Sequence, residues 1–72
     1  MRRFINDKYK ISFNVPTTLT EYISLAEAAD EKNDLGNYLI YADEIDTLAK
    51  SCCESGDITP EMWDVLVLRY CQ

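Results

Sequence analysis

The stretch Gly56-Asp57-Ile58-Thr59-Pro60-Glu61-Met62-Trp63 separates two helical patterns and decides how the chain is divided. Thr59 is a good N-cap residue, and a proline directly after the cap sits at a position where its missing N–H costs nothing. Gly56 can adopt the left-handed conformation that ends many helices. We therefore predict one helix that ends before Gly56 and another over residues 59–71, with Ile58 packed against Trp63.

Apolar spacing predicts two further helices upstream, over residues 18–32 and 34–54. Asn33 and Asp34 are good N-cap residues for the longer helix, and Thr18-Leu19-Thr20-Glu21 has the pattern of a capping box for the other. The connection between them is short, so antiparallel packing is expected. The predicted inward faces are Leu19, Tyr22, Ile23, Ala26 and Ala29 in the first helix, and Leu35, Tyr38, Leu39, Ala42, Ile45, Leu48, Ala49 and Cys52 in the second.

Residues 1–16 have a different pattern, in which Tyr9, Ile11, Phe13 and Val15 alternate with polar residues. This period of two predicts a half-buried strand that ends at Pro16. A lone strand leaves backbone groups unpaired, so three arrangements are open: a hairpin with residues 2–5, pairing with a second copy, or an irregular path across the helices. We expect a single mainly α domain, residues 1–72, of three helices with an N-terminal β-strand or short hairpin.

Charge is divided unevenly along the chain, whose net charge is −6. Twelve of the thirteen acids lie between Glu21 and Asp64, whereas four of the seven basic residues lie in the first ten positions. Such a surface repels phosphate backbones and anionic lipid and attracts basic partners, although acids also serve solubility. The acids cluster as Asp30-Glu31 with Asp34, as Asp43-Glu44 with Asp46, and as Glu61 with Asp64; we expect solvated helix faces, since acid–base work by paired carboxylates needs a walled cleft.

Several kinds of chemistry have no residues to carry them. The chain has no histidine, the usual general base and commonest metal ligand, and its two glycines form no phosphate-binding loop. The adjacent Cys52 and Cys53 lack zinc-site spacing, so we expect buried cysteines; redox sensing and metal binding are the alternatives. We predict no enzyme activity, cofactor or metal. An odd cysteine number without a secretory or membrane-spanning apolar segment favours the cytoplasm.

Two resemblances concern residues already quoted. Residues 56–63 resemble the Gly-x-Ile-Thr-x-Glu opening of short C-terminal oligomerisation modules of the SHOCT type. The whole chain resembles the small acidic proteins carried on phages and conjugative elements of Gram-positive bacteria. This second likeness implies a mobile-element setting and no catalytic activity.

The run Tyr38-Leu39-Ile40-Tyr41 is too apolar for one helix face to bury. If Leu39 and Ala42 point inward, Ile40 points to solvent among acids. The predicted partner-binding residues are Ile40, Tyr41, Asp43, Glu44 and Thr47; alternatively, this helix is sandwiched between the other two or between two copies.

The sequence therefore predicts a non-enzymatic protein–protein interaction module that docks an acidic helical surface on a basic partner. The alternatives are a nucleic-acid mimic that inhibits a host enzyme, and a structural homodimer. The apolar run Val65–Leu68 favours either a dimer or an outside partner. Direct nucleic-acid binding is not expected, because the third helix offers only Arg69 as a basic contact.

Overall fold

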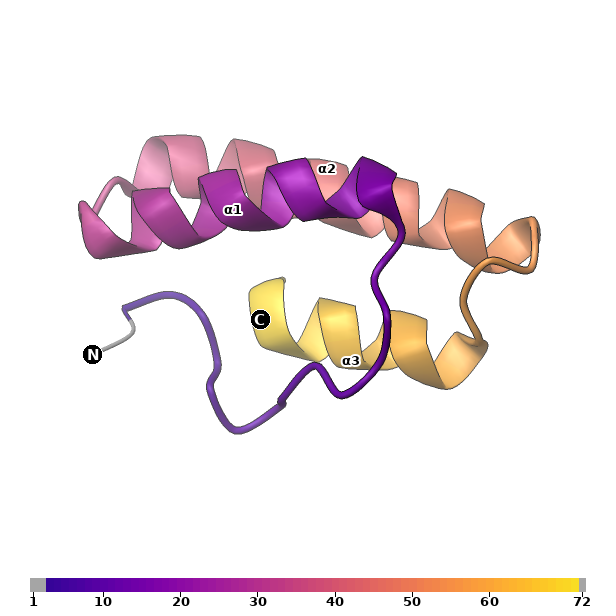
Figure 1. Ribbon diagram of the computed structural model, residues 1–72. Helices are drawn as coiled ribbons and strands as arrows, with labels where there is room; N and C mark the ends of the chain where they lie inside the picture. Colours follow the sequence, from indigo (N-terminus) through magenta and orange to yellow (C-terminus); the bar gives the residue numbers. More distant parts are fainter. Residues whose placement is uncertain (1–2, 72) are drawn as a thin grey trace.

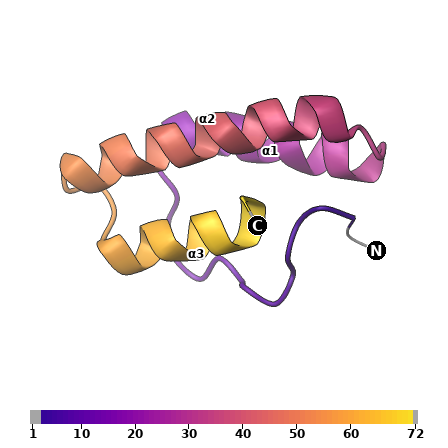
Figure 2. The same cartoon turned by 180° about the vertical axis from the view of Figure 1, so that it is seen from behind.

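A computed structural model describes residues 3–71, and within them the chain forms three α-helices. They are α1 (Thr17–Glu31), α2 (Leu35–Glu54) and α3 (Pro60–Tyr70), each end within one residue of the predicted range. α1 and α2 lie side by side and antiparallel, and α3 packs beneath α2 (Figure 1), as the view from behind also shows (Figure 2). The prediction of a mainly α fold is confirmed.

The predicted ends of α2 and α3 are confirmed by their hydrogen bonds. The Asp34 carboxylate accepts the N–H of Asn37 at 3.3 Å and caps α2. Gly56 has a φ of 85°, the left-handed conformation that the sequence predicted beyond the helix end. The Thr59 hydroxyl accepts the N–H of Met62 at 3.2 Å and caps α3, while the Thr59 N–H donates to the Met62 sulfur at 3.5 Å.

The predicted capping box of α1 is wrong. α1 begins at Thr17, so Thr18 already lies inside the helix, and the cap residue is Pro16 with no side-chain bond. The Pro16 carbonyl accepts the N–H groups of Leu19 and Thr20 at 2.9 and 3.3 Å. Asn33 takes a φ of 56° in the turn that joins α1 to α2, a conformation that asparagine tolerates better than most residues.

The core lies between the three helices and includes most of the predicted inward faces. Its buried apolar residues are Ile5, Leu19, Ala26, Ala29, Tyr38, Ala42, Ile45, Ala49, Cys52, Ile58, Leu66 and Tyr70. Leu35 and Leu39 were predicted to be buried, and this is wrong: 50% and 58% of their surface is exposed. The physical reason is length, because 11 residues of α3 span about 17 Å and cannot cover the roughly 30 Å of α2.

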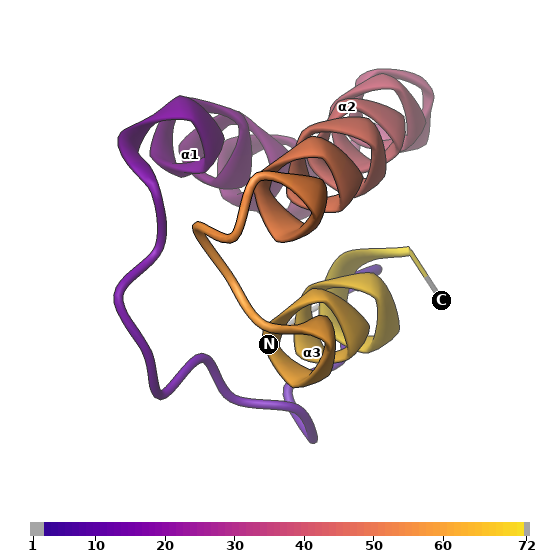
Figure 3. The ribbon, with the colours of Figure 1, turned by 90° about the vertical axis from the view of Figure 1, so that its right-hand side faces the viewer.

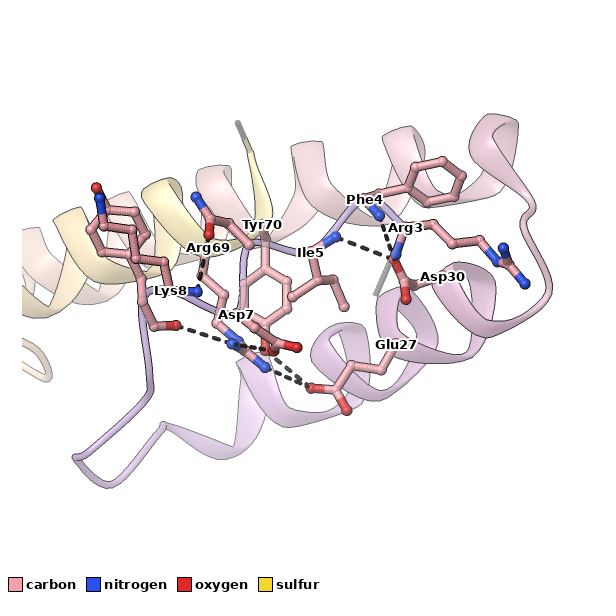
Figure 4. Close-up of polar contacts among 11 residues, drawn as sticks. Arg3, Phe4, Ile5, Asp7, Lys8, Glu27, Asp30, Arg69 and Tyr70 are labelled. Carbon is pink, nitrogen blue, oxygen red and sulfur yellow. Dashed lines mark hydrogen bonds and ion pairs between the residues drawn. The ribbon is translucent and has the colours of Figure 1, made fainter. Parts of the chain in front are cut away.

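The predicted N-terminal strand or hairpin is not formed, since residues 3–16 contain no strand. The backbone N–H groups of Arg3, Phe4 and Ile5 all donate to the Oδ1 atom of Asp30, at 2.9, 2.6 and 3.2 Å (Figure 4). These donors are therefore unavailable to a β-ladder. Residue 2 of the predicted hairpin lies outside the described residues. The segment instead follows the third arrangement, an irregular path across the helices.

A second set of contacts ties the N-terminal segment to the end of α3. The Asn6 N–H donates to the Arg69 carbonyl at 2.8 Å, and the Arg69 guanidinium donates to Asp7 at 3.2 Å and to the Tyr9 carbonyl at 3.0 Å. The ring of Phe4 packs on Tyr38, with 5.1 Å between centroids. Viewed along the helices, the segment spans the open side between α1 and α3 (Figure 3). We call residues 3–9 the N-terminal strap.

The strap and the residues after it also change the expectation for α3. Leu66 is fully buried, and Val65, Val67 and Leu68 are half-buried, so the apolar run is better covered than expected of a monomer. Phe13 helps to cover it and lines a hollow together with Met62 and Val65.

Within residues 3–71 no helix is both long enough and apolar enough to cross a membrane.

Candidate functional site

Three large apolar side chains lie exposed within two turns of the first half of α2. Leu35, Leu39 and Ile40 expose 50%, 58% and 59% of their surface. Scattered single apolar residues are normal on a protein surface, but Leu35 and Leu39 lie one turn apart on the same side of α2 and form a patch, with Ile40 on the adjacent side of the helix. The patch exists because α2 extends beyond the end of α3.

A hollow of about 250 Å³ adjoins this patch where α3 ends. Its lining residues come from the first half of α2 and from the end of α3: Tyr38, Leu39, Ala42, Asp43, Asp46, Tyr70 and Cys71. Two hydrogen bonds fix its floor, since the Tyr38 hydroxyl donates to the Tyr70 carbonyl at 2.6 Å and the Cys71 thiol donates to the Ala42 carbonyl at 3.3 Å. The hollow is therefore a built feature of the α2–α3 packing.

Two carboxylates give the hollow a negative rim. Asp43 and Asp46 take part in no ion pair with residues 3–71. Arg69, the basic residue of α3, pairs instead with Asp7 and Glu27 at 3.2 and 3.9 Å. Asp46 is held in place by the indole N–H of Trp63, which donates to its Oδ1 atom at 3.2 Å. The last turn of α3 adds the negative end of a helix dipole.

The thiol of Cys71 responds to this negative charge. Burial of the sulfur, followed by the carboxylates of Asp46 and Asp43, raises the pKa of Cys71 from 9.0 to about 11. A cation placed in the same position would be stabilised by the same two carboxylates. The hollow therefore favours positively charged groups.

The residues predicted to bind a partner do not all lie together. Ile40 is exposed, as predicted, and Asp43 lines the hollow. Thr47 is exposed and its hydroxyl donates to the Asp43 carbonyl at 3.1 Å, while Glu44 is half-buried. Tyr41 lies on the other flank of α2, where it lines a separate small hollow against α1.

Sequence reasoning missed Leu35, Leu39 and Asp46. Helical apolar spacing placed the two leucines on the inward face, and nothing in that spacing marks where a neighbouring helix ends. The usable signal was the difference in predicted length between residues 34–54 and residues 59–71. We call Leu35, Leu39, Ile40, Asp43 and Asp46, with the adjoining hollow, the α2 surface.

The other residues considered in the sequence, Asp30 and the cysteines of α2, form no second candidate site. Asp30 was predicted to lie on a solvated acidic face, and this is wrong, because it is fully buried and binds the strap. Cys52 is buried and Cys53 half-buried, as expected for core cysteines. No group of three or more Cys, Asp or Glu in residues 3–71 is arranged to hold a metal ion.

No family model, no curated protein and no solved structure matches this chain.

Proposed function

We propose that the chain is a non-enzymatic protein-interaction module that binds a basic partner protein through the α2 surface. The observation that carries the proposal is the presence of exposed apolar side chains beside two carboxylates that form no ion pair within residues 3–71. Leu35, Leu39 and Ile40 supply an apolar centre, and Asp43 and Asp46 supply a charged rim. Protein interfaces commonly combine an apolar centre with a polar rim.

Charge complementarity selects a basic partner over a second copy of this chain. A symmetric dimer through the α2 surface would bring Asp43 and Asp46 of two chains together, each chain carrying a net charge of −6. Like charges brought together at an interface oppose binding, whereas lysines and arginines would be attracted. A homodimer through this face is therefore the less favourable occupant.

The apolar centre also separates this proposal from nucleic-acid mimicry. A groove that holds nucleic acid is recognised mainly through charge, and such binding is lost steeply as salt rises. Leu39 and Ile40 would contribute little to contacts of that kind. The mobile-element setting implied by the sequence resemblance remains a prediction.

Selection from a displayed library of random peptides tests the proposal. We expect the wild-type chain to enrich sequences that combine Lys or Arg with apolar residues, and these peptides to bind the Leu39→Asp variant at least tenfold more weakly. Leu25→Asp is the matched control, because Leu25 is an exposed leucine on α1. Circular dichroism establishes that both variants are folded.

Two results would overturn the proposal. One is the absence of any enriched basic and apolar sequence. The other is enriched peptides that bind wild type and Leu39→Asp equally well. If such binding also disappeared at high salt, charge alone would explain it, as nucleic-acid mimicry requires.

A further inference from the structure

We infer that the segment bound by the α2 surface is a short amphipathic α-helix with lysine or arginine beside its apolar stripe. This inference rests on the proposed function and specifies the chemistry of the partner. It follows from the shape of the surface, from the kind of contact that it offers, and from its charge.

The first half of α2 presents a surface against which another helix could pack. α3 packs along the second half of α2 and ends at Tyr70, where the Cys71 thiol reaches the Ala42 carbonyl. Beyond this point, Leu35 and Leu39 are one helical turn apart on α2, and at least half of each is exposed because α3 does not extend over them. Figure 1 shows α3 ending part-way along α2. Rows of side chains four residues apart are the ridges against which another helix packs.

The surface offers side chains and no strand edge. Residues 3–71 contain no strand, so an extended peptide has no β-ladder to join. The backbone groups in the middle of α2 are bonded within the helix. Of the common modes of peptide recognition, helix-in-groove binding needs only an apolar surface that receives side chains at i, i+3 or i+4.

The hollow is sized for side chains. Its volume of about 250 Å³ is below the roughly 300–1,000 Å³ of typical small-molecule pockets. An apolar side chain of the partner would enter the hollow beside Leu39 and rest on the floor that Tyr38 and Tyr70 form, as interface anchors do. A neighbouring lysine or arginine would then lie against Asp43 and Asp46.

Other occupants fit less well. The strap is already bound at Asp30 and Arg69, so it cannot cover the α2 surface while those contacts persist. A second copy would meet carboxylates with carboxylates. The hollow lined by Phe13, Met62 and Val65 lies along a different part of α3 and has Glu61 as its only acid.

Three synthetic peptides of about 16 residues, none containing tryptophan, test the inference. The first has leucines at helical spacing and lysines elsewhere. The second has the same composition with leucine and lysine alternating, so that it cannot form an amphipathic helix. The third is the first peptide with glutamate in place of lysine.

Two signals report binding at the α2 surface. Trp63 is the only tryptophan, and its indole N–H donates to Asp46, so its fluorescence should change when the rim is occupied. Alkylation of Cys71 by iodoacetamide should be slowed by the bound peptide, because the peptide covers the sulfur, and burial raises the pKa of this thiol more than the carboxylates that a lysine would neutralise. Cys53, half-buried on the last turns of α2 and absent from the hollow, is the internal control.

We expect the helical lysine peptide to bind at least tenfold more tightly than its alternating isomer, to protect Cys71 but not Cys53, and to be weakened by Leu39→Asp. The glutamate peptide should not bind. Equal affinity for the two lysine peptides, with the same sensitivity to Leu39→Asp, would overturn the helical partner and leave the proposed function standing. The inference of a helical partner would also be overturned if none of the three peptides bound, or if a bound peptide left Cys71 unprotected.

Discussion

The Oδ1 atom of Asp30 lies 2.6 Å from the backbone nitrogen of Phe4. The same oxygen also accepts the N–H groups of Arg3 and Ile5, so three successive amides converge on one buried carboxylate (Figure 4). Successive backbone amides that point inward form an anion-binding concavity, and here the anion is a side chain of α1. This contact holds residues 3–5, which were one of the possible partners of the predicted strand.

Replacement of Asp30 by alanine should lower the free energy of unfolding by about 2–4 kcal/mol, because the part-buried N–H of Phe4 and the buried N–H of Ile5 would lose their charged acceptor. Urea denaturation measures the loss, and hydrogen exchange should show faster exchange at these two amides. Glu31→Ala is the matched control, since Glu31 is the exposed neighbour. Equal stability of the two variants would contradict the role given to Asp30.

High pH should destabilise the fold through two buried tyrosines. Burial raises the pKa of Tyr38 and of Tyr70 above the ordinary value of 10.0. Because the folded state keeps these protons longer than the unfolded state, their contribution is complete below about pH 10 and is lost as the pH rises further. Urea midpoints between pH 8 and 11 should fall above pH 10, and less steeply in Tyr38→Phe. A midpoint that stays constant to pH 11 would argue against this burial.

Cys71 should react slowly with iodoacetamide although part of the residue is exposed. Its pKa of about 11 leaves little thiolate at pH 8.5, and thiolate is the reactive form. The double variant Asp43→Asn, Asp46→Asn should lower this pKa and speed the reaction several-fold. The urea-unfolded chain sets the reference rate. A rate in the folded wild type that equals the reference would show that the carboxylates do not act on the thiol.

Truncation of two leucines should have very different effects on stability, because Leu66 is buried in the α3 packing and Leu39 lies beyond the end of α3. Leu66→Ala removes a fully buried side chain and should lower the free energy of unfolding by about 2–5 kcal/mol. Leu39→Ala should change it by less than about 0.5 kcal/mol, since Leu39 is 58% exposed. Similar losses in the two variants would mean that the start of α2 is covered in solution.

Local signals in the sequence predicted the helices well. The caps at Asp34 and Thr59 and the left-handed Gly56 depend on residues within a few positions of one another, so the sequence alone specifies them. The alternation of Tyr9, Ile11 and their neighbours is also local, but a strand needs a partner, and the amides of residues 3–5, its possible hairpin partner, donate to Asp30 instead.

Tertiary contacts account for what the sequence did not predict. The burial of Asp30 depends on amides 25 to 27 residues away, and no spacing rule distinguishes it from the exposed Glu31. The exposure of Leu39 depends on where α3 ends in space. Both corrections concern the contacts of one element with another, which periodicity within an element cannot supply.

The most direct measurement of the central claim is a map of backbone amide NMR shifts as the helical lysine peptide is added. We expect the largest changes at Leu35, Leu39, Asp43, Asp46 and Cys71, and we expect Leu39→Asp to abolish them. Changes centred instead on the solvent face of α1, around Glu21, Ser24 and Ala28, would contradict binding through the α2 surface.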